Sequence, residues 1–205
     1  MIADQLGLPE GGHRYKGNLH AHSTNSDGRH APERVAADFK AQGYQFLCLS
    51  EHDLFTDLSA ELDGEGFIIL PGLEASAYLY ADEARTSRLR CHHMHGILGT
   101  DEMLAAAPKR FAHGERLEPL ERFGSWDGLA VAEELRDELL ARGCIVTYNH
   151  PIWSRIEPED VLGLTGVFGI EVYNYDTENE GGDGADTVYW DLLLRRGERI
   201  GAIAA

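Results

Sequence analysis

Short apolar runs alternate with amphipathic segments along most of this chain of 205 residues. Apolar runs of about four to eight residues are typical of buried strands, and apolar positions three or four apart are typical of one-sided helices. The runs predict strands at 15–19, 46–50, 67–70, 90–98, 145–148, 167–173 and 199–205. The helical spacing predicts helices at 31–42, 127–142 and 187–196.

The order of these segments indicates an α/β fold. Strand follows helix follows strand, which is typical of parallel strands with helices packed outside them. Asp127 suits the cap that begins the second helix, and Gly143 suits its end. The segment 100–126 contains several Pro and Gly residues and predicts a long loop with some helix at its start. The acidic, glycine-rich segment 178–184 predicts another loop. We expect a single domain over 1–205.

The charge and the cysteines of the chain limit the partners and the location that we expect for it. The chain has 18 Lys and Arg against 35 Asp and Glu, a formal net charge of −17. Binding of long nucleic acid depends on basic residues that neutralise phosphates, so such a partner is not expected. No apolar run is long enough to cross a bilayer, so no membrane partner is expected either. Cys48, Cys91 and Cys144 lie in separate apolar segments, which indicates buried free thiols and a cytoplasmic protein.

Almost all residues that can carry chemistry lie at or just past the end of a predicted strand. His20 and His22 end the first strand, and side chains two apart share a face, so two imidazoles point at one place. Asp27, in a Ser-Asp-Gly turn, can fold back toward them. The later members of this set are His52, Glu74, His95, His150 and Glu171. Sites in α/β folds are built at this end of the strands, so we expect one shared site.

These residue types point to divalent metal ions. Imidazoles and carboxylates without thiolates suit zinc, manganese or iron. The candidates outnumber the four ligands of a tetrahedral zinc, so more than one ion is expected. Such ions suit phosphoester hydrolysis, because they turn a bound water into a hydroxide that attacks phosphorus and they neutralise the phosphate. Arg155 is the expected substrate-binding cation, since a guanidinium makes forked contacts with phosphate.

The ordered motifs resemble the polymerase and histidinol phosphatase (PHP) superfamily. They are HAHSTNSDG from His20, SEHD, PGLE, the histidine-rich strand CHHMHGILG, and NHP ending at Pro151. The resemblance covers most of the chain. It implies a distorted (β/α)7 barrel of the TIM type with a two- or three-metal site at the carboxyl ends of the strands. Its implied activity is phosphoester hydrolysis.

The resemblance also implies ligand sets. His20, His22 and Glu74 would hold a first ion, and Glu74 would bridge to a second ion held by His95 and His150. Asp27 and His52 would hold a third. His93 has the same strand parity as His95 and is the alternative ligand, whereas His92 and Met94 should point the other way.

The end of the sequence departs from the family pattern. That pattern closes with a strand followed by Asp-x-His, which supplies further ligands, whereas this sequence ends with a strand-like segment at 201–205. We expect the sequence to lack the C-terminal part of a longer domain. The alternative is a variant with a reduced metal site.

The leading hypothesis is a metal-dependent hydrolase acting on a small phosphorylated substrate. Asp27 and His52 are candidates for moving a proton to the leaving oxygen, and Glu171 is a weaker candidate for a supporting or substrate-contacting role. The alternatives are a nuclease on nucleotide or short oligonucleotide ends, an amidohydrolase, and a non-catalytic metal-binding module. Many amidohydrolases need a bridging Lys, and none of Lys16, Lys40 and Lys109 ends a suitable strand.

Overall fold

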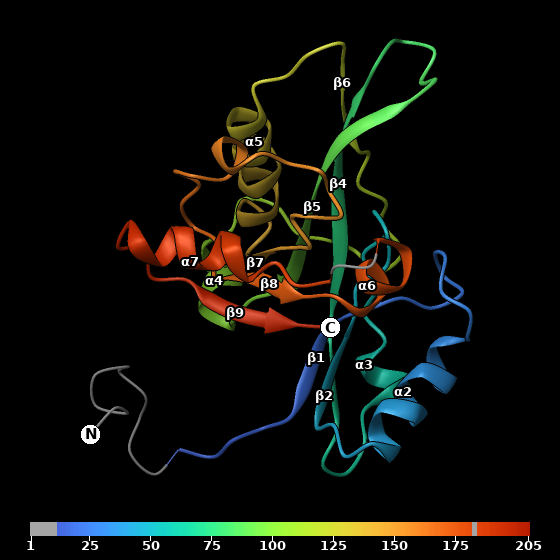
Figure 1. Cartoon of the computed structure of the whole chain (residues 1–205). Coiled ribbons are helices and arrows are strands. Elements are labelled where there is room, and N and C mark those ends of the chain that lie inside the picture. Colours follow the sequence, from blue (N-terminus) through green and yellow to red (C-terminus); the bar gives the residue numbers. More distant parts are fainter. Residues whose placement is uncertain (1–11, 182–183) are drawn as a thin grey trace.

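The computed structural model describes residues 12–181 and 184–205 and arranges them around two β-sheets (Figure 1). The smaller sheet has three parallel strands, in the order β1 (Gly17–Ala21), β2 (Phe46–Leu49) and β3 (Ile68–Leu70). The larger sheet has six strands in the order β6-β4-β5-β7-β8-β9. Their bounds are β4 Gly72–Tyr80, β5 Arg88–Leu98, β6 Leu120–Phe123, β7 Cys144–Tyr148, β8 Gly169–Tyr173 and β9 Gly201–Ala204.

Helices accompany each sheet. α2 (Pro32–Ala41) and the short α3 (Ser59–Leu62) lie beside the smaller sheet, and α5 (Gly128–Leu140) and α7 (Thr187–Arg195) pack on the larger one. The connections contain α4 (Asp101–Ala106), a 3-10 turn at Pro158–Asp160, and α6 (Tyr175–Gly181). No helix in the described ranges is both long and apolar enough to span a membrane.

Each sheet has its own core. Leu135 and Leu139 of α5 pack on the larger sheet, while Leu47, Leu49 and Phe67 belong to a smaller cluster beside α2. A large apolar side chain that becomes fully buried contributes roughly 1.5–3 kcal/mol. Because the first cluster contains many more buried side chains, the larger sheet is the main stabilising unit. Free, buried thiols are confirmed for all three cysteines.

The chain changes sheets at Pro71, between β3 and β4. Proline has no N–H to donate to a strand ladder, so the pairing of β3 ends there. Thr56 and Gly72 then exchange two backbone hydrogen bonds of 3.0 and 3.1 Å. A Cβ on Gly72 would lie 2.8 Å from Cys48 Sγ and 2.9 Å from the Gly96 carbonyl oxygen, so only glycine fits this crossing point.

The α/β class is confirmed, but the expected distorted (β/α)7 barrel is not, because the described residues form two sheets and no closed barrel. β5 runs antiparallel to both β4 and β7. β4 and β5 are joined by a hairpin closed by the Ala81 N to Ser87 O bond of 2.9 Å, and so short a connection permits only antiparallel pairing. Within the described residues no ladder joins β9 to β1, although the two strands lie near each other. The fold is an open, mixed α/β arrangement of two sheets.

The predicted positions of the helices agree with the structure better than the predicted strand pairing does. The three predicted helices are confirmed as α2, α5 and α7, and Asp127 caps α5 by accepting a hydrogen bond of 3.1 Å from Ala130 N. The segment 100–126, predicted as a loop, also contains β6, which pairs with β4. In the other predicted loop, 178–181 belong to α6, whereas Gly182 and Asp183 lie outside the described residues.

Candidate metal centre

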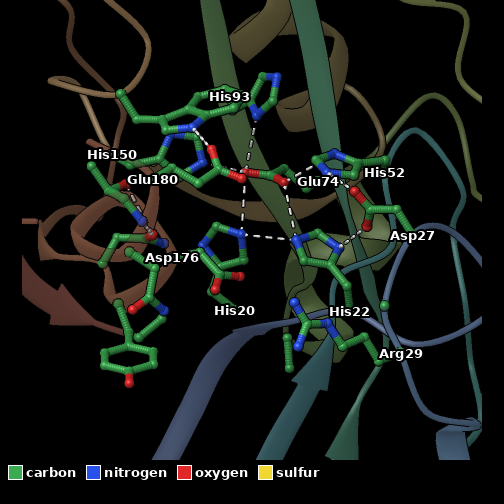
Figure 2. Close-up of a pocket in the computed structure, with 18 residues that line it drawn as sticks. His20, His22, Asp27, Arg29, His52, Glu74, His93, His150, Asp176 and Glu180 are labelled. Atoms are coloured by element: carbon green, nitrogen blue, oxygen red, sulfur yellow. Dashed lines mark hydrogen bonds and ion pairs between the residues drawn. The ribbon is translucent and has the colours of Figure 1, made fainter. Parts of the chain in front are cut away.

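The end of β1 presents two imidazoles side by side. His20 is close to the end of β1 and His22 follows it, so strand alternation turns both rings the same way. Their Nε2 atoms lie 3.1 Å apart, and Figure 2 shows both rings facing one carboxylate, that of Glu74. Glu74 Oε1 lies 3.4 Å from His20 Nε2, and Oε2 lies 3.4 Å from His22 Nε2.

Glu74 lies inside β4 and is fully buried. The imidazoles of His52, His93 and His150 also face it, at 3.1, 3.4 and 3.1 Å. Asn149 Nδ2 donates to Oε1 at 2.6 Å. Burial opposes ionisation of Glu74, but the charges of His20 and His93 and hydrogen bonds from imidazoles hold its pKa well below the usual value. Five histidines from four segments of the chain therefore converge on one carboxylate.

Asp27 lies over the exposed side of this cluster. Its Oδ2 is 3.4 Å from His52 Nε2 and its Oδ1 is 3.9 Å from His22 Nδ1. The His22 and His52 rings stack with centroids 4.4 Å apart. These three side chains therefore form a second potential ligand group at the mouth of the site.

The histidine-rich strand β5 sends alternate rings to opposite faces. His93 turns toward Glu74, whereas His92 packs on the other face, where its Nδ1 lies 2.5 Å from Tyr148 Oη. His95 shares the parity of His93 but lies behind His20, with ring centroids 4.3 Å apart and its Nδ1 3.0 Å from Thr147 Oγ1. The structure thus places His93, the alternative ligand, closer to the carboxylate cluster than His95.

Glu171, in β8, supports two of the histidines. Its Oε1 lies 3.0 Å from His20 Nδ1, and its Oε2 accepts a hydrogen bond of 3.0 Å from His150 N. Burial opposes ionisation of Glu171, but the nearby charge and hydrogen bond of His20 lower its pKa. A carboxylate on Nδ1 leaves the Nε2 of His20 to face the centre of the cluster.

The donor set fits divalent cations. Four groups of three side chains have potential ligand atoms within 4.8 Å of one another, namely His20-His22-Glu74, His52-Glu74-His93, His22-Asp27-His52 and His20-His150-Glu171. Several buried atoms of this cluster have no hydrogen-bond partner: His22 Nδ1, His52 Nδ1, Glu74 Oε2, both ring nitrogens of His93, and His95 Nε2. Unpaired buried polar atoms are costly, and metal ligation would satisfy them.

The pKa shifts of the histidines also suit the binding of divalent cations. Burial lowers the pKa of His22 to about 3 and that of His93 to about 4, so both rings are neutral near pH 7, as metal ligands must be. Burial also opposes protonation of His20, but the carboxylates of Glu74 and Glu171 raise its pKa well above the usual value. The space between His20 and these two carboxylates therefore favours positive charge.

The cluster opens into a cavity of about 600 Å³. Arg29, from the loop after β1, lines its rim (Figure 2). Trp153 and the α6 side chains Asp176 and Glu180 line another part of the wall, and Trp153 Nε1 donates to Glu180 Oε2 at 2.7 Å. Arg155 is exposed and is not part of this lining, so among the described residues the cation at the cavity is Arg29.

Known structures share this fold. No family model and no curated protein matches the sequence. A two-domain protein of Bacteroides vulgatus that contains a predicted PHP-like metal-dependent phosphoesterase is similar over 91% of this chain and 50% of its own, at 17% identity and a TM-score of 0.51. A Bifidobacterium adolescentis protein named as a candidate metal-dependent phosphoesterase is similar over 93% and 87%, at 15% identity and a TM-score of 0.52.

A third similar structure is named for a different activity. An amidohydrolase of Chromobacterium violaceum, solved with sulfate and without metal, is similar over 91% of this chain and 88% of its own, at 16% identity and a TM-score of 0.56. This chain spans about half the length of the Bacteroides relative and most of the other two. At 15–17% identity these likenesses show a shared fold: the chain folds like two structures named for metal-dependent phosphoesterases, one of them called PHP-like, and like one named an amidohydrolase.

Sequence reasoning missed several residues of the site. Asn149 precedes His150 in the NHP motif and holds Glu74, and Arg29 directly follows the Ser-Asp-Gly turn. Their places next to identified motifs were the available signal. The α6 wall was missed because the segment has no apolar periodicity. Its helix begins where the Asn174 side chain accepts a hydrogen bond of 2.8 Å from Thr177 N.

Proposed function

We propose that this chain is a metal-dependent phosphoesterase that hydrolyses a small phosphorylated substrate. The observation that carries the proposal is the convergence of five imidazoles on the buried Glu74, with ligand atoms left unpaired by the protein. Two of the three structural relatives are named as metal-dependent phosphoesterases, which supports the reaction class.

The proposed ligands follow the distances. His20, His22 and Glu74 would hold one ion, and Glu74 with His93 and His150 would hold another. Asp27 and His52 would hold a third at the mouth of the site. The ions are zinc, manganese or iron, since the donors are imidazole and carboxylate. When bound, such ions supply a nucleophilic hydroxide at neutral pH and neutralise phosphate charge. His95, behind His20, is assigned a packing role in this scheme.

The remaining side chains bind and orient the substrate. Arg29 at the cavity rim makes a forked contact with the phosphate, the role that the sequence suggested for Arg155. Asp27, with two-thirds of its side chain exposed, and His52 would pass a proton to the leaving oxygen when the third ion is not bound. Glu171 keeps His20 oriented through Nδ1. The acidic wall and the net charge of −17 disfavour a long polyanion, so a small substrate is preferred to a nucleic acid end.

Amide hydrolysis is the second candidate because one structural relative is named an amidohydrolase. Glu74 occupies the centre of the cluster, and the lysines lie elsewhere: Lys16 over Tyr44, Lys40 near Phe67 and Lys109 on Glu138. A modified lysine therefore cannot bridge ions here, which favours the phosphoesterase.

The test is phosphate release from protein stripped with a chelator and reloaded with Mn²⁺ or Zn²⁺. The substrates are p-nitrophenyl phosphate, sugar phosphates, nucleoside monophosphates and a short oligonucleotide, with an amide panel in parallel. Activity should depend on added metal and should fall to background in the His20→Ala, His22→Ala double variant. His30→Ala, which removes an exposed histidine outside the cluster, should keep it. Full activity in the double variant would refute the proposal.

A further inference from the structure

Glu51 is a buried carboxylate that serves the loop beside the metal centre. It is 0% exposed, and it has no ion pair in the part of the chain that the structure describes. Its two oxygens face three donors of one loop instead. Ser23 N lies 3.1 Å from each oxygen, and the hydroxyls of Ser23 and Ser26 each donate to one of them. A buried charge without a cation depends on such hydrogen bonds.

That loop is a tight turn around Ser23. The Ser23 carbonyl oxygen accepts from Ser26 N at 3.1 Å and from Gly28 N at 2.9 Å, and the Ser23 hydroxyl accepts from Asn25 N at 3.2 Å. A Cβ on Gly28 would lie 2.4 Å from the His22 carbonyl oxygen, so only glycine fits. The turn is therefore compact, and the Glu51 carboxylate binds both Ser23 and Ser26 within it.

Asp27 sits on this turn and is not fixed by its own contacts. Its side chain is 66% exposed, and its distances of 3.4 Å to His52 Nε2 and 3.9 Å to His22 Nδ1 are ion-pair contacts without hydrogen-bond geometry. A free aspartate at that exposure would sample several rotamers. The position of its backbone is what directs the carboxylate toward the two rings.

The other end of Glu51 is attached to the strand that carries Glu74. Glu74 N donates to the Glu51 carbonyl oxygen at 3.0 Å, and Asp53 N donates to the Glu74 carbonyl oxygen at 2.8 Å. The Asp53 side chain accepts from Ser76 N at 2.8 Å. Glu51 thus joins, through one residue, the loop of Asp27, the neighbouring His52 and the backbone of β4.

We propose that Glu51 is a positioning residue that holds the 23–28 loop so that Asp27 stands over His22 and His52. It belongs to none of the potential ligand groups, does not line the cavity, and acts through the two serine hydroxyls. The inference rests on the proposed metal centre and goes beyond it by assigning what builds its outermost ligand group. Partners that orient ligands typically change metal affinity by about 10–100-fold when they are removed.

The test is calorimetric titration of Mn²⁺ into the chelator-stripped protein of residues 1–205. Glu51→Gln and Ser26→Ala should weaken one class of Mn²⁺ sites by roughly 10–100-fold and leave the tightest class unchanged. Ser26→Thr keeps the hydroxyl and should bind like the unaltered protein. Asp27→Asn should weaken the same class, and Glu51→Gln should add little to it in the double variant, because both changes act on one group.

A matched control separates positioning from simple destabilisation. Asp160 is another buried carboxylate, bonded to Arg90 and to Glu157 N, so Asp160→Asn should lower the thermal midpoint and leave every Mn²⁺ class intact. The inference fails if Glu51→Gln weakens all classes alike or matches the unaltered protein while that protein binds Mn²⁺. If the unaltered protein neither binds Mn²⁺ nor hydrolyses a phosphoester, the proposed function fails with it.

Discussion

At the scale of single residues, neighbouring charges counteract the effect that burial has on the pKa of Glu74. Burial disfavours ionised Glu74, and imidazole neighbours reverse that effect and keep its pKa low. Burial leaves His22 and His93 neutral, with pKa values of about 3 and about 4. At neutral pH the centre therefore offers the Glu74 anion together with the neutral imidazoles of His22 and His93. A divalent cation would take the place of the proton that the raised pKa of His20 favours.

The two inward histidines of β5 should differ in their effect on metal content. His93→Ala should remove one bound ion, because this ring faces Glu74 and neither of its nitrogens has a hydrogen-bond partner. His95→Ala should keep the metal count and lower stability, because the ring fills space behind His20. Elemental analysis after dialysis against Mn²⁺ measures both. The reverse result, with the ion lost only in His95→Ala, would contradict the ligand assignment.

Residue-level prediction succeeded where strand parity decides the outcome. The alternation of β1 and β5 indicated that His20 and His22 share a direction and that His92 and Met94 point away from His93. It could not rank His93 against His95, because both rings lie on the same face of β5. The choice depends on the register of β5 against β4, which pairs His93 with Ser76 and His95 with Glu74. Such register is set by tertiary pairing and leaves no trace in the local pattern.

At the scale of elements, α5 begins with a side-chain cap. Asp127 Oδ1 accepts from Ala130 N at 3.1 Å, and α5 carries Leu135 and Leu139 into the larger core. Asp127→Ala should lower the free energy of unfolding by about 1 kcal/mol, measured by urea titration. Asp127→Asn should retain most of it, because an amide oxygen also caps. Equal losses in the two variants would show that the cap is not the cause.

The order of elements was predictable in part, since the pattern did not predict β4 and β6 as strands, and strand pairing was not predictable. Apolar runs mark strands whichever way their neighbours run, so β5 was expected to be parallel although its hairpin to β4 makes it antiparallel. α6 lacks apolar periodicity and was expected to be a loop. The change of sheet at Pro71 has a local cause, the missing N–H, but a proline alone does not reveal which sheet each side joins.

At the scale of the whole molecule, buried histidines make stability depend on pH. His92 stacks on Trp126 with centroids 4.4 Å apart, and burial lowers its pKa from 6.5 to about 3. Between these values the unfolded chain binds a proton that the folded protein does not. The metal-free protein should therefore lose stability as the pH falls below 6.5, by up to about 1.4 kcal/mol per pH unit for this group.

The measurement is urea unfolding of chelator-treated protein between pH 7 and pH 4. His92→Phe keeps a ring on Trp126 and removes the titrating group, so its stability should fall less steeply with acid, by about one proton. His22 and His93 contribute in the same direction and remain in the variant. An unchanged slope would mean that His92 is already protonated in the folded protein.

The sheet change at Pro71 has a consequence for the molecule as a whole. The chain before Pro71 carries four of the proposed site residues, His20, His22, Asp27 and His52. The chain after it carries the other four, Glu74, His93, His150 and Glu171. Bound ions would link the β1–β3 part of the chain to the larger sheet, although each part has its own core. Amide protons of β1–β3 should consequently exchange with solvent more slowly after ion loading, while α5, remote from the ions, keeps its exchange rate.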